Sequence, residues 1–409
     1  MAVIRPFCAL RPTVKSAADV AAVPYDVVST DEARRLALDN SLSFLHVSRA
    51  EVGLPAGTDP YSAEVYERAS LNLTRLQTSA PLVVDEEPSL YLYGLRTDQH
   101  EQIGLAGCFS LAEYDAGIVK RHERTRPDKE DDRTNHMVTV GAQTGIVFLT
   151  YRSDAAVDAV IERCSGQDPL LDIIATDKVR HTIWRLSADD AGDAVRSFAR
   201  VPAVYIADGH HRIASAARAR QELPSSDPEA EVHFFLGVAF PDVKTRILPY
   251  NRTVADLADQ TPDAFLDLLR SQFPVKRSDT SVPPKGSVAM YLQGQWWSID
   301  FGLVRERMAL GSPVSKLDVA MLQDCVMAPL LGIADIRTDP RVTFVGGGRG
   351  TDVLVQSVDS GEAAVAFSLA AVTPTELLDI SDADEMMPPK STWFEPKLRD
   401  GLLIHPLQP

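Results

Sequence analysis

Cysteine pairs and long apolar runs are both missing from this sequence, and each absence narrows the class of protein. The four cysteines are scattered and form no CxxC pair: Cys8, Cys108, Cys164 and Cys325. This spacing argues against a disulfide framework and against a zinc site built from thiolates. No apolar run approaches the ~20 residues that cross a bilayer, and the opening residues MAVIRPFCALRP lack the apolar core of a signal peptide. We therefore expect a cytoplasmic protein without a membrane-spanning segment.

Positive charge is also scarce relative to negative charge. The chain has 41 Lys and Arg against 57 Asp and Glu, which gives a formal net charge of −16. This balance argues against nucleic acid or an anionic membrane as the main partner, because basic surfaces bind both through their phosphates. The 45% hydrophobic and 24% charged residues are typical of a globular protein. A length of 409 residues predicts more than one domain.

One stretch, AVYIADGHHRIASAARAR at residues 203–220, predicts a turn between a strand and a helix. Residues 203–207 are apolar, as in a short buried strand, and the residues after the turn favour helix until Pro224. The turn itself consists of Asp208, Gly209, His210, His211 and Arg212. A helix N-terminus presents backbone N–H groups and the positive end of the helix dipole, and both attract phosphate.

The same turn carries the groups that a phosphate site needs. The backbone N–H groups of residues 209–211 and the Arg212 guanidinium are suitable phosphate donors. Gly209 lets the backbone approach closely, and Asp208 offers a ligand for Mg²⁺. The alternative is a capped helix whose histidines are structural. Zinc is disfavoured, because neighbouring histidines on one turn point apart and no third ligand lies at metal-site spacing.

A second motif, RHERTRPDKEDDR, begins directly after the apolar strand AGIV. Its charge alone is typical of a solvated loop. However, His122 and Glu123 stand at the end of the predicted strand, where side chains are held firmly. A carboxylate in that position can take a proton from a substrate hydroxyl. The residues by themselves leave both interpretations open.

A third motif, VPYDVVS, is a turn in which Pro24 presents Tyr25 and Asp26. A structural Asx turn is the favoured interpretation, and Asp26 is the alternative candidate for a catalytic base.

The glycine-rich GGGRG at residues 346–350 has no Lys-Ser/Thr after it and no helix-forming run. These absences argue against a phosphate loop. We expect a hairpin loop between the strands RVTFV and TDVLVQSV.

Five motifs in this order resemble a bacterial and archaeal family, the domain of unknown function 1015. They cover nearly the whole chain and read VPYDVVS, IVKRHERTRPDKEDDR, YIADGHHRIASA, LDVAMLQDCVMAPLLGI and PPKSTWFEPKLRDGLL. The central segment is similar to the superfamily of free serine kinases and ParB-like nucleotide-binding proteins, which includes sulfiredoxin. In that superfamily a Gly-x-(His/Arg)-Arg turn at a helix N-terminus holds nucleotide phosphates. Gly209, His211 and Arg212 match this turn.

The resemblance implies a role for each candidate residue. Free serine kinases phosphorylate the hydroxyl of L-serine. They carry an Asp-Gly-His-His-Arg turn and, upstream, a Pro-His-Glu segment whose Glu acts as the catalytic base. The segment KRHERT matches the His-Glu of this motif but has Arg121 in place of the proline. The implied catalytic residues, of which Asp208 would hold Mg²⁺, are Glu123, Asp208 and His211. The implied nucleotide-binding residues are Gly209, His210, His211 and Arg212. The residues expected to bind the substrate are Tyr25, Asp26, His122, Lys390 and Ser391.

We therefore expect a mixed α/β (α+β) fold, with a nucleotide-binding core like that of ParB and the serine kinases and with flanking α/β lobes. The expected domains are an N-terminal lobe (1–100), the core (101–254), a second α/β lobe (255–375) and a C-terminal tail docked on the body (376–409).

The implied function is a phosphotransferase that moves a phosphoryl group, in either direction, between ATP or ADP and a small hydroxylated metabolite. Free serine and phosphoserine are the favoured pair. Two alternatives stay open: a nucleotide or phosphoester hydrolase, and a non-enzymatic ParB-like switch controlled by nucleotide. The expected partners are the nucleotide and the small substrate, without membrane or nucleic acid, and a homodimer is left open.

Overall fold

The computed structural model describes residues 1–79, 81–307 and 311–407, and the chain forms two compact units. The first unit combines Met1–Thr245 with the C-terminal residues from Pro396, and the second consists of Arg246–Glu395. Each unit contains helices and a sheet, so the mixed α/β fold predicted from the sequence is confirmed. The finer division into four domains stays a prediction. The last two residues of its predicted C-terminal tail, 408 and 409, lie outside the described part of the chain.

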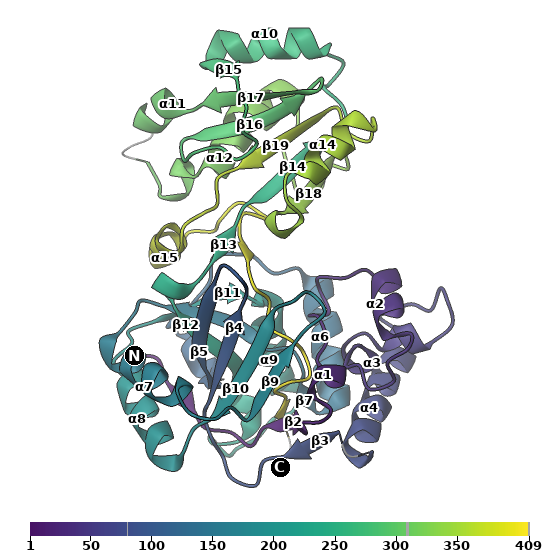
Figure 1. Cartoon of the computed structure of the whole chain (residues 1–409), viewed down its shortest axis with the longest axis vertical. Helices are drawn as coiled ribbons and strands as arrows, with labels where there is room; N and C mark the ends of the chain where they lie inside the picture. Colours follow the sequence, from purple (N-terminus) through teal and green to yellow (C-terminus); the bar gives the residue numbers. More distant parts are fainter. Residues whose placement is uncertain (80, 308–310, 408–409) are drawn as a thin grey trace. The chain divides into compact units, whose positions relative to one another are not determined.

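A mixed sheet forms the centre of the first unit (Figure 1). Its strands follow the order β6-β11-β8-β12-β5-β4-β10-β9, and β1 pairs with β5. Strand β8 runs parallel to β12 and antiparallel to β11. The strands of this sheet are β1 Ile4–Arg5, β4 Tyr91–Arg96, β5 Glu101–Ser110, β6 Val119–Lys120, β8 Val147–Tyr151, β9 Leu171–Ile174, β10 Arg180–Arg185, β11 Val204–Asp208 and β12 Phe234–Pro241. Strands β4 and β5 pair with each other in antiparallel orientation.

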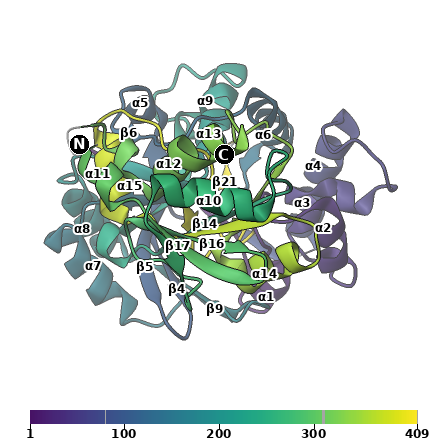
Figure 2. The same ribbon diagram turned by 90° about the horizontal axis from the view of Figure 1, so that it is seen from above.

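Helices pack against this sheet and against one another. Helix α7 contacts α8, and α6 contacts α9; Figure 2 shows α2, α3 and α4 grouped together at one side. The helices are α1 Ala17–Val20, α2 Thr30–Ala37, α3 Leu45–Ser48, α4 Ala63–Thr78, α5 Leu111–Asp115, α6 Pro127–Val140, α7 Ala155–Ser165, α8 Ala188–Phe198 and α9 His210–Glu222. Two short strand pairs complete the unit: β2 Leu10–Pro12 with β3 Leu82–Val84, and β7 Ala142–Gln143 with β21 His405–Pro406.

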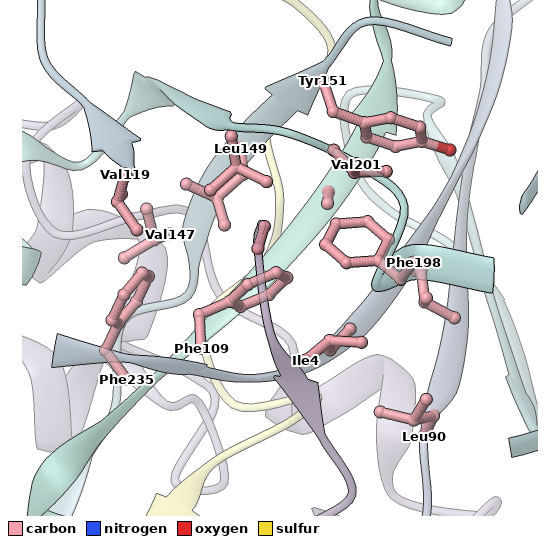
Figure 3. Packing of buried hydrophobic residues seen from close by; sticks show 14 of the residues in the cluster. Ile4, Leu90, Phe109, Val119, Val147, Leu149, Tyr151, Phe198, Val201 and Phe235 are labelled. Carbon is pink, nitrogen blue, oxygen red and sulfur yellow. The ribbon is translucent and has the colours of Figure 1, made fainter. Parts of the chain in front are cut away.

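The core of the first unit is built from apolar side chains of the sheet and of the helices that cover it (Figure 3). The ring of Phe109 on β5 contacts Phe198 on α8 and Phe235 on β12, with centroids 5.8 and 5.7 Å apart. Leu149 on β8 is fully buried in the same cluster. Because β8 and β11 meet within this core, the end of β11 is held on a rigid support.

The second unit has its own antiparallel sheet. The strands follow the order β15-β17-β16-β19-β14-β18. Their bounds are β14 Tyr250–Val254, β15 Val275–Arg277, β16 Ser287–Leu292, β17 Gln295–Asp300, β18 Val342–Gly346 and β19 Val365–Leu369, and a separate pair joins β13 Ile247–Leu248 to β20 Trp393–Phe394. The helices are α10 Pro262–Gln272, α11 Gly302–Arg307, α12 Asp318–Leu322, α13 Ala328–Leu331, α14 Asp352–Asp359 and α15 Pro374–Asp382.

The hairpin predicted around GGGRG is wrong, because the second of its strands is the helix α14. A 3₁₀ turn at Gly347–Arg349 follows β18, and the helix begins at Asp352. Leu354 is fully buried, and Val355 and Val358 pack against the same cluster. Positions three and four residues apart share one face of a helix. The segment is rich in valine, which favours strands, and it was therefore predicted as a strand although its buried residues have helical spacing.

The charged RHERTRPDKEDDR stretch is irregular only over residues 121–126, after which helix α6 begins. Proline is favoured in the first turn of a helix, and Asp128 and Glu130 complement the positive end of its dipole. Gly141, with φ +68°, ends the helix in the left-handed conformation. The solvated-loop interpretation of this stretch is therefore wrong for residues 127–133, which are helical.

A buried leucine and an exposed leucine can be compared to test the assignment of the core. We expect Leu149→Ala to lower the free energy of unfolding by about 2–5 kcal/mol, because it leaves a cavity in packed surroundings. Leu71→Ala on α4 is the control, since the Leu71 side chain is 63% exposed, and we expect about 0.5 kcal/mol or less from it. Urea unfolding of both variants measures the difference, and equal losses would contradict the assigned core.

Candidate functional site

The predicted turn between a strand and a helix is confirmed at the end of β11. Asp208 is the last residue of the strand, and α9 starts two residues later at His210. Gly209 between them has φ +103°, a conformation that side chains with a Cβ rarely adopt. The first N–H groups of a helix have no intrahelical acceptor. A helix N-terminus of this kind attracts negative charge.

Asp208 forms an ion pair with Lys397, whose Nζ lies 3.0 Å from Asp208 Oδ2. Burial opposes ionisation of Asp208, but Lys397 and Arg212 outweigh it and hold the pKa of this carboxyl well below its usual range. The carboxylate is thus ionised, as a ligand for Mg²⁺ has to be. The sequence did not single out Lys397, which lies 189 residues from its partner.

Arg212 is buried and fixed by three hydrogen bonds. One terminal nitrogen donates to both oxygens of Asp26, at 3.0 Å each, and the other donates to the carbonyl of Ile146 at 2.7 Å. Burial disfavours the charged guanidinium, but Asp26 and Asp208 more than compensate and raise the pKa of Arg212 above its ordinary value. The ring of Tyr25 also faces the guanidinium, 5.5 Å from its centre. Two predicted residues, Tyr25 and Asp26, thus lie next to a third.

Both histidines of the turn hold the segment that carries Glu123. The backbone N–H of His122 donates to His210 Nε2 at 3.4 Å, and the backbone N–H of Arg126 donates to His211 Nε2 at 3.0 Å. A ring nitrogen that accepts a hydrogen bond is unprotonated. Burial, with the neighbouring His122 ring, lowers the pKa of His210 well below its usual range and keeps this imidazole neutral.

Glu123 faces His210 across a short gap, with 3.9 Å between Glu123 Oε2 and His210 Nδ1. Its side chain is 40% exposed, whereas that of His210 is 4% exposed. The carboxylate therefore lies at the boundary between the N-terminus of α9 and solvent.

Two imidazoles and one carboxylate meet at this place. One ligand atom each of His122, Glu123 and His210 lies within 4.8 Å of the others, a donor set that could hold a metal ion. His122 is 2% exposed, and burial lowers the pKa of His122 to about 4. Of the two turn histidines only His210 takes part, and the other two donors come from the distant segment that carries His122 and Glu123.

A small cavity adjoins the Arg212 pair. Tyr25, Arg133, His136 and Arg212 supply its polar lining, together with Thr144. Arg133 stacks on Tyr25, with 4.3 Å from the guanidinium carbon to the ring centre.

Asp400 is a further residue that the sequence analysis missed. It is 2% exposed, and its electrostatic neighbours include Arg212 and Asp26. Burial raises the pKa of Asp400 to about 7; Arg212 opposes this shift and Asp26 adds to it. The sequence offered one indication of Asp400, because the segment PKLRDGLLI places charged residues directly beside apolar ones.

Lys390 and Ser391 belong to the second unit. Lys390 has φ +52°, and Arg252 donates to its carbonyl and to that of Pro389, both at 3.3 Å. Ser391 is buried and donates to the carbonyl of Pro388. Their role in binding substrate stays a prediction.

A family model with the description "Protein of unknown function (DUF1015)" matches residues 4–320 of the chain. The chain belongs to this family. No curated protein matches it. Within the described residues, no helix is both long and apolar enough to cross a membrane.

Several solved structures are similar to the chain. A free serine kinase in complex with AMP is 12% identical, with a TM-score of 0.37 over 74% of this chain and 91% of the other. SbnI with a C-terminal truncation, from Staphylococcus aureus, is 10% identical, with a TM-score of 0.39 over 74% and 87%. A conserved hypothetical protein from Pyrococcus furiosus is 14% identical, with a TM-score of 0.34 over 73% and 95%.

Asp400 predicts a pH dependence of stability. A carboxyl whose pKa is higher in the folded than in the unfolded state binds its proton more tightly when folded, so stability falls as pH rises from about 4 to 7. We expect Asp400→Asn to remove this loss, so that its free energy of unfolding gains on the wild type by on the order of 2–4 kcal/mol over that range. Urea unfolding at several pH values measures it.

Asp98→Asn is the control, because Asp98 is exposed between β4 and β5. Profiles of Asp400→Asn and wild type that stay parallel from pH 4 to 7 would show that Asp400 ionises normally.

Proposed function

We propose that the protein is a phosphotransferase that moves a phosphoryl group between a nucleotide and the hydroxyl of a small metabolite, with free serine and phosphoserine as the favoured pair. The observation that carries the proposal is the approach of Glu123 to the N-terminus of α9, 3.9 Å from His210. A phosphate-binding helix end and an adjacent carboxylate are the two parts that transfer to a hydroxyl needs.

Each residue then has a physical task. The N–H groups at the start of α9 and the dipole of the helix bind the phosphates. Glu123, held by the histidine-anchored segment, orients the hydroxyl and accepts its proton. Asp208 fits Mg²⁺ as an ionised oxygen ligand, and the bound ion would neutralise phosphate charge. Arg212 is a positioning residue, because its guanidinium ties Asp26 and Ile146 to the first turn of α9.

The reaction itself is the first test. The purified protein is incubated with Mg²⁺, ATP or ADP and a pool of hydroxylated metabolites that contains serine, and ³¹P NMR follows the products. We expect a phosphomonoester resonance that requires the metabolite and is strongest with serine, because the site orients a hydroxyl beside a phosphate. Free phosphate alone would identify a hydrolase, and an unchanged spectrum would favour a nucleotide-controlled switch.

Glu123→Gln tests the proposed base. Glutamine accepts a hydrogen bond from the hydroxyl but cannot take its proton, so we expect transfer to slow about 10²–10⁴-fold with nucleotide binding intact. The acidic limb of the pH–rate profile should disappear with it. Glu162→Gln, at an exposed position of α7, is the matched control and should be as fast as wild type.

Asp26→Asn separates the alternative base from the proposed one. If this variant loses transfer and keeps its stability, while Glu123→Gln stays active, then Asp26 is the base and the proposed role of Glu123 is wrong.

A further inference from the structure

The C-terminal segment of the first unit brings an ammonium group to the phosphate turn. Lys397 Nζ lies 3.0 Å from Asp208 Oδ2, and Asp208 directly precedes Gly209, the N-cap of α9. Both side chains are partly exposed, 16% for Lys397 and 28% for Asp208. A cation is therefore held at the solvent-facing edge of a helix end that attracts anions.

The backbone that carries this lysine is firmly anchored. Asp400 and Ala22 exchange two backbone hydrogen bonds of 3.0 Å, and Ile404 and Leu10 exchange two of 2.9 and 3.0 Å. The N–H of Arg399 donates to the Tyr93 hydroxyl at 3.2 Å, and the Arg399 side chain forms an ion pair with Asp177. Such anchoring exceeds what a surface lysine needs, and it fixes the reach of Lys397 to the turn.

The two cations of the site differ in how they are held. The Arg212 side chain is 7% exposed, and its two terminal nitrogens are engaged by Asp26 and Ile146, so a phosphate would have to displace these partners from a buried guanidinium. Taking its carboxylate from a buried cation is strongly unfavourable. A lysine ammonium is a compact charge on a flexible stem and exchanges its partners readily. Lys397 is thus the better phosphate ligand.

We propose that Lys397 binds the terminal phosphate of the nucleotide, and that Asp208 holds the ammonium in place while no nucleotide is bound. The proposal rests on the proposed function, since it takes the N-terminus of α9 as the phosphate site. The phosphate site is then made of two segments of the first unit that are distant in the sequence, the N-terminus of α9 and the segment that carries Lys397.

The test is equilibrium binding of ADP and of adenosine, measured by calorimetry in buffer with EDTA so that no divalent metal contributes. Four proteins are compared: the wild type, Lys397→Met, Asp208→Asn and the double variant. We expect Lys397→Met to weaken ADP binding about 10- to 100-fold, because it removes one charge-assisted phosphate contact. The affinity for adenosine, which has no phosphate, should not change.

The Asp208→Asn background separates ligand binding from folding. Lys397→Met alone leaves the Asp208 carboxylate without its cation and can destabilise the protein. In the double variant both charges of the pair are removed, so no unpaired charge is left behind. We expect Lys397→Met to weaken ADP binding in both backgrounds. Lys15→Met, which removes an exposed positive charge from the same unit, should bind ADP like the wild type.

Two results would overturn the inference in different ways. If the wild type binds ADP and Lys397→Met binds it equally well in the Asp208→Asn background, then Lys397 is only the counter-ion of Asp208, and the proposed function survives. If the wild type binds neither ADP nor ATP, with or without Mg²⁺, the proposed function fails together with the inference.

Discussion

A guanidinium buried at the start of a helix is the constraint on which the first unit depends. Arg212 has lost most of its contact with water, and an uncompensated buried charge is costly. Its charge is balanced from the turn after Pro24 by Asp26, while Asp208 and Asp400 add negative charge nearby. Asp208 belongs to the same turn as Arg212, whereas Asp26 and Asp400 come from distant segments, so the charge balance of the buried arginine depends on the tertiary fold.

The surplus of carboxyls around Arg212 explains the state of each neighbour. Asp208 is served by a second cation, Lys397, and stays ionised. Asp400 is buried, and burial raises its pKa to about 7 although Arg212 opposes the shift; the neighbouring Arg399 pairs with Asp177. An anionic ligand at this place would add to the negative charge. We therefore expect an anionic ligand to bind only where a further cation, either an ammonium group of the protein or a metal ion, offsets its negative charge.

Local signals in the sequence predicted the centre of the site, and its completion is non-local. The apolar run of β11, Gly209 and the helix-forming residues of α9 lie within 20 residues, so the turn could be predicted from them. The pairing of Lys397 with Asp208 depends on how the chain returns after the second unit, which no local pattern records. Helix α14 was mispredicted because valine favours strands in general, while burial of Leu354 decided the local outcome.

The two candidate bases are not equivalent once their partners are considered. Both oxygens of Asp26 accept hydrogen bonds from Arg212, so protonation of Asp26 would weaken the ion pair that keeps the guanidinium buried. Glu123 faces a neutral imidazole, and its side chain is partly open to solvent. The proposed function therefore gives proton transfer to Glu123 and leaves Asp26 to the ion pair that holds Arg212.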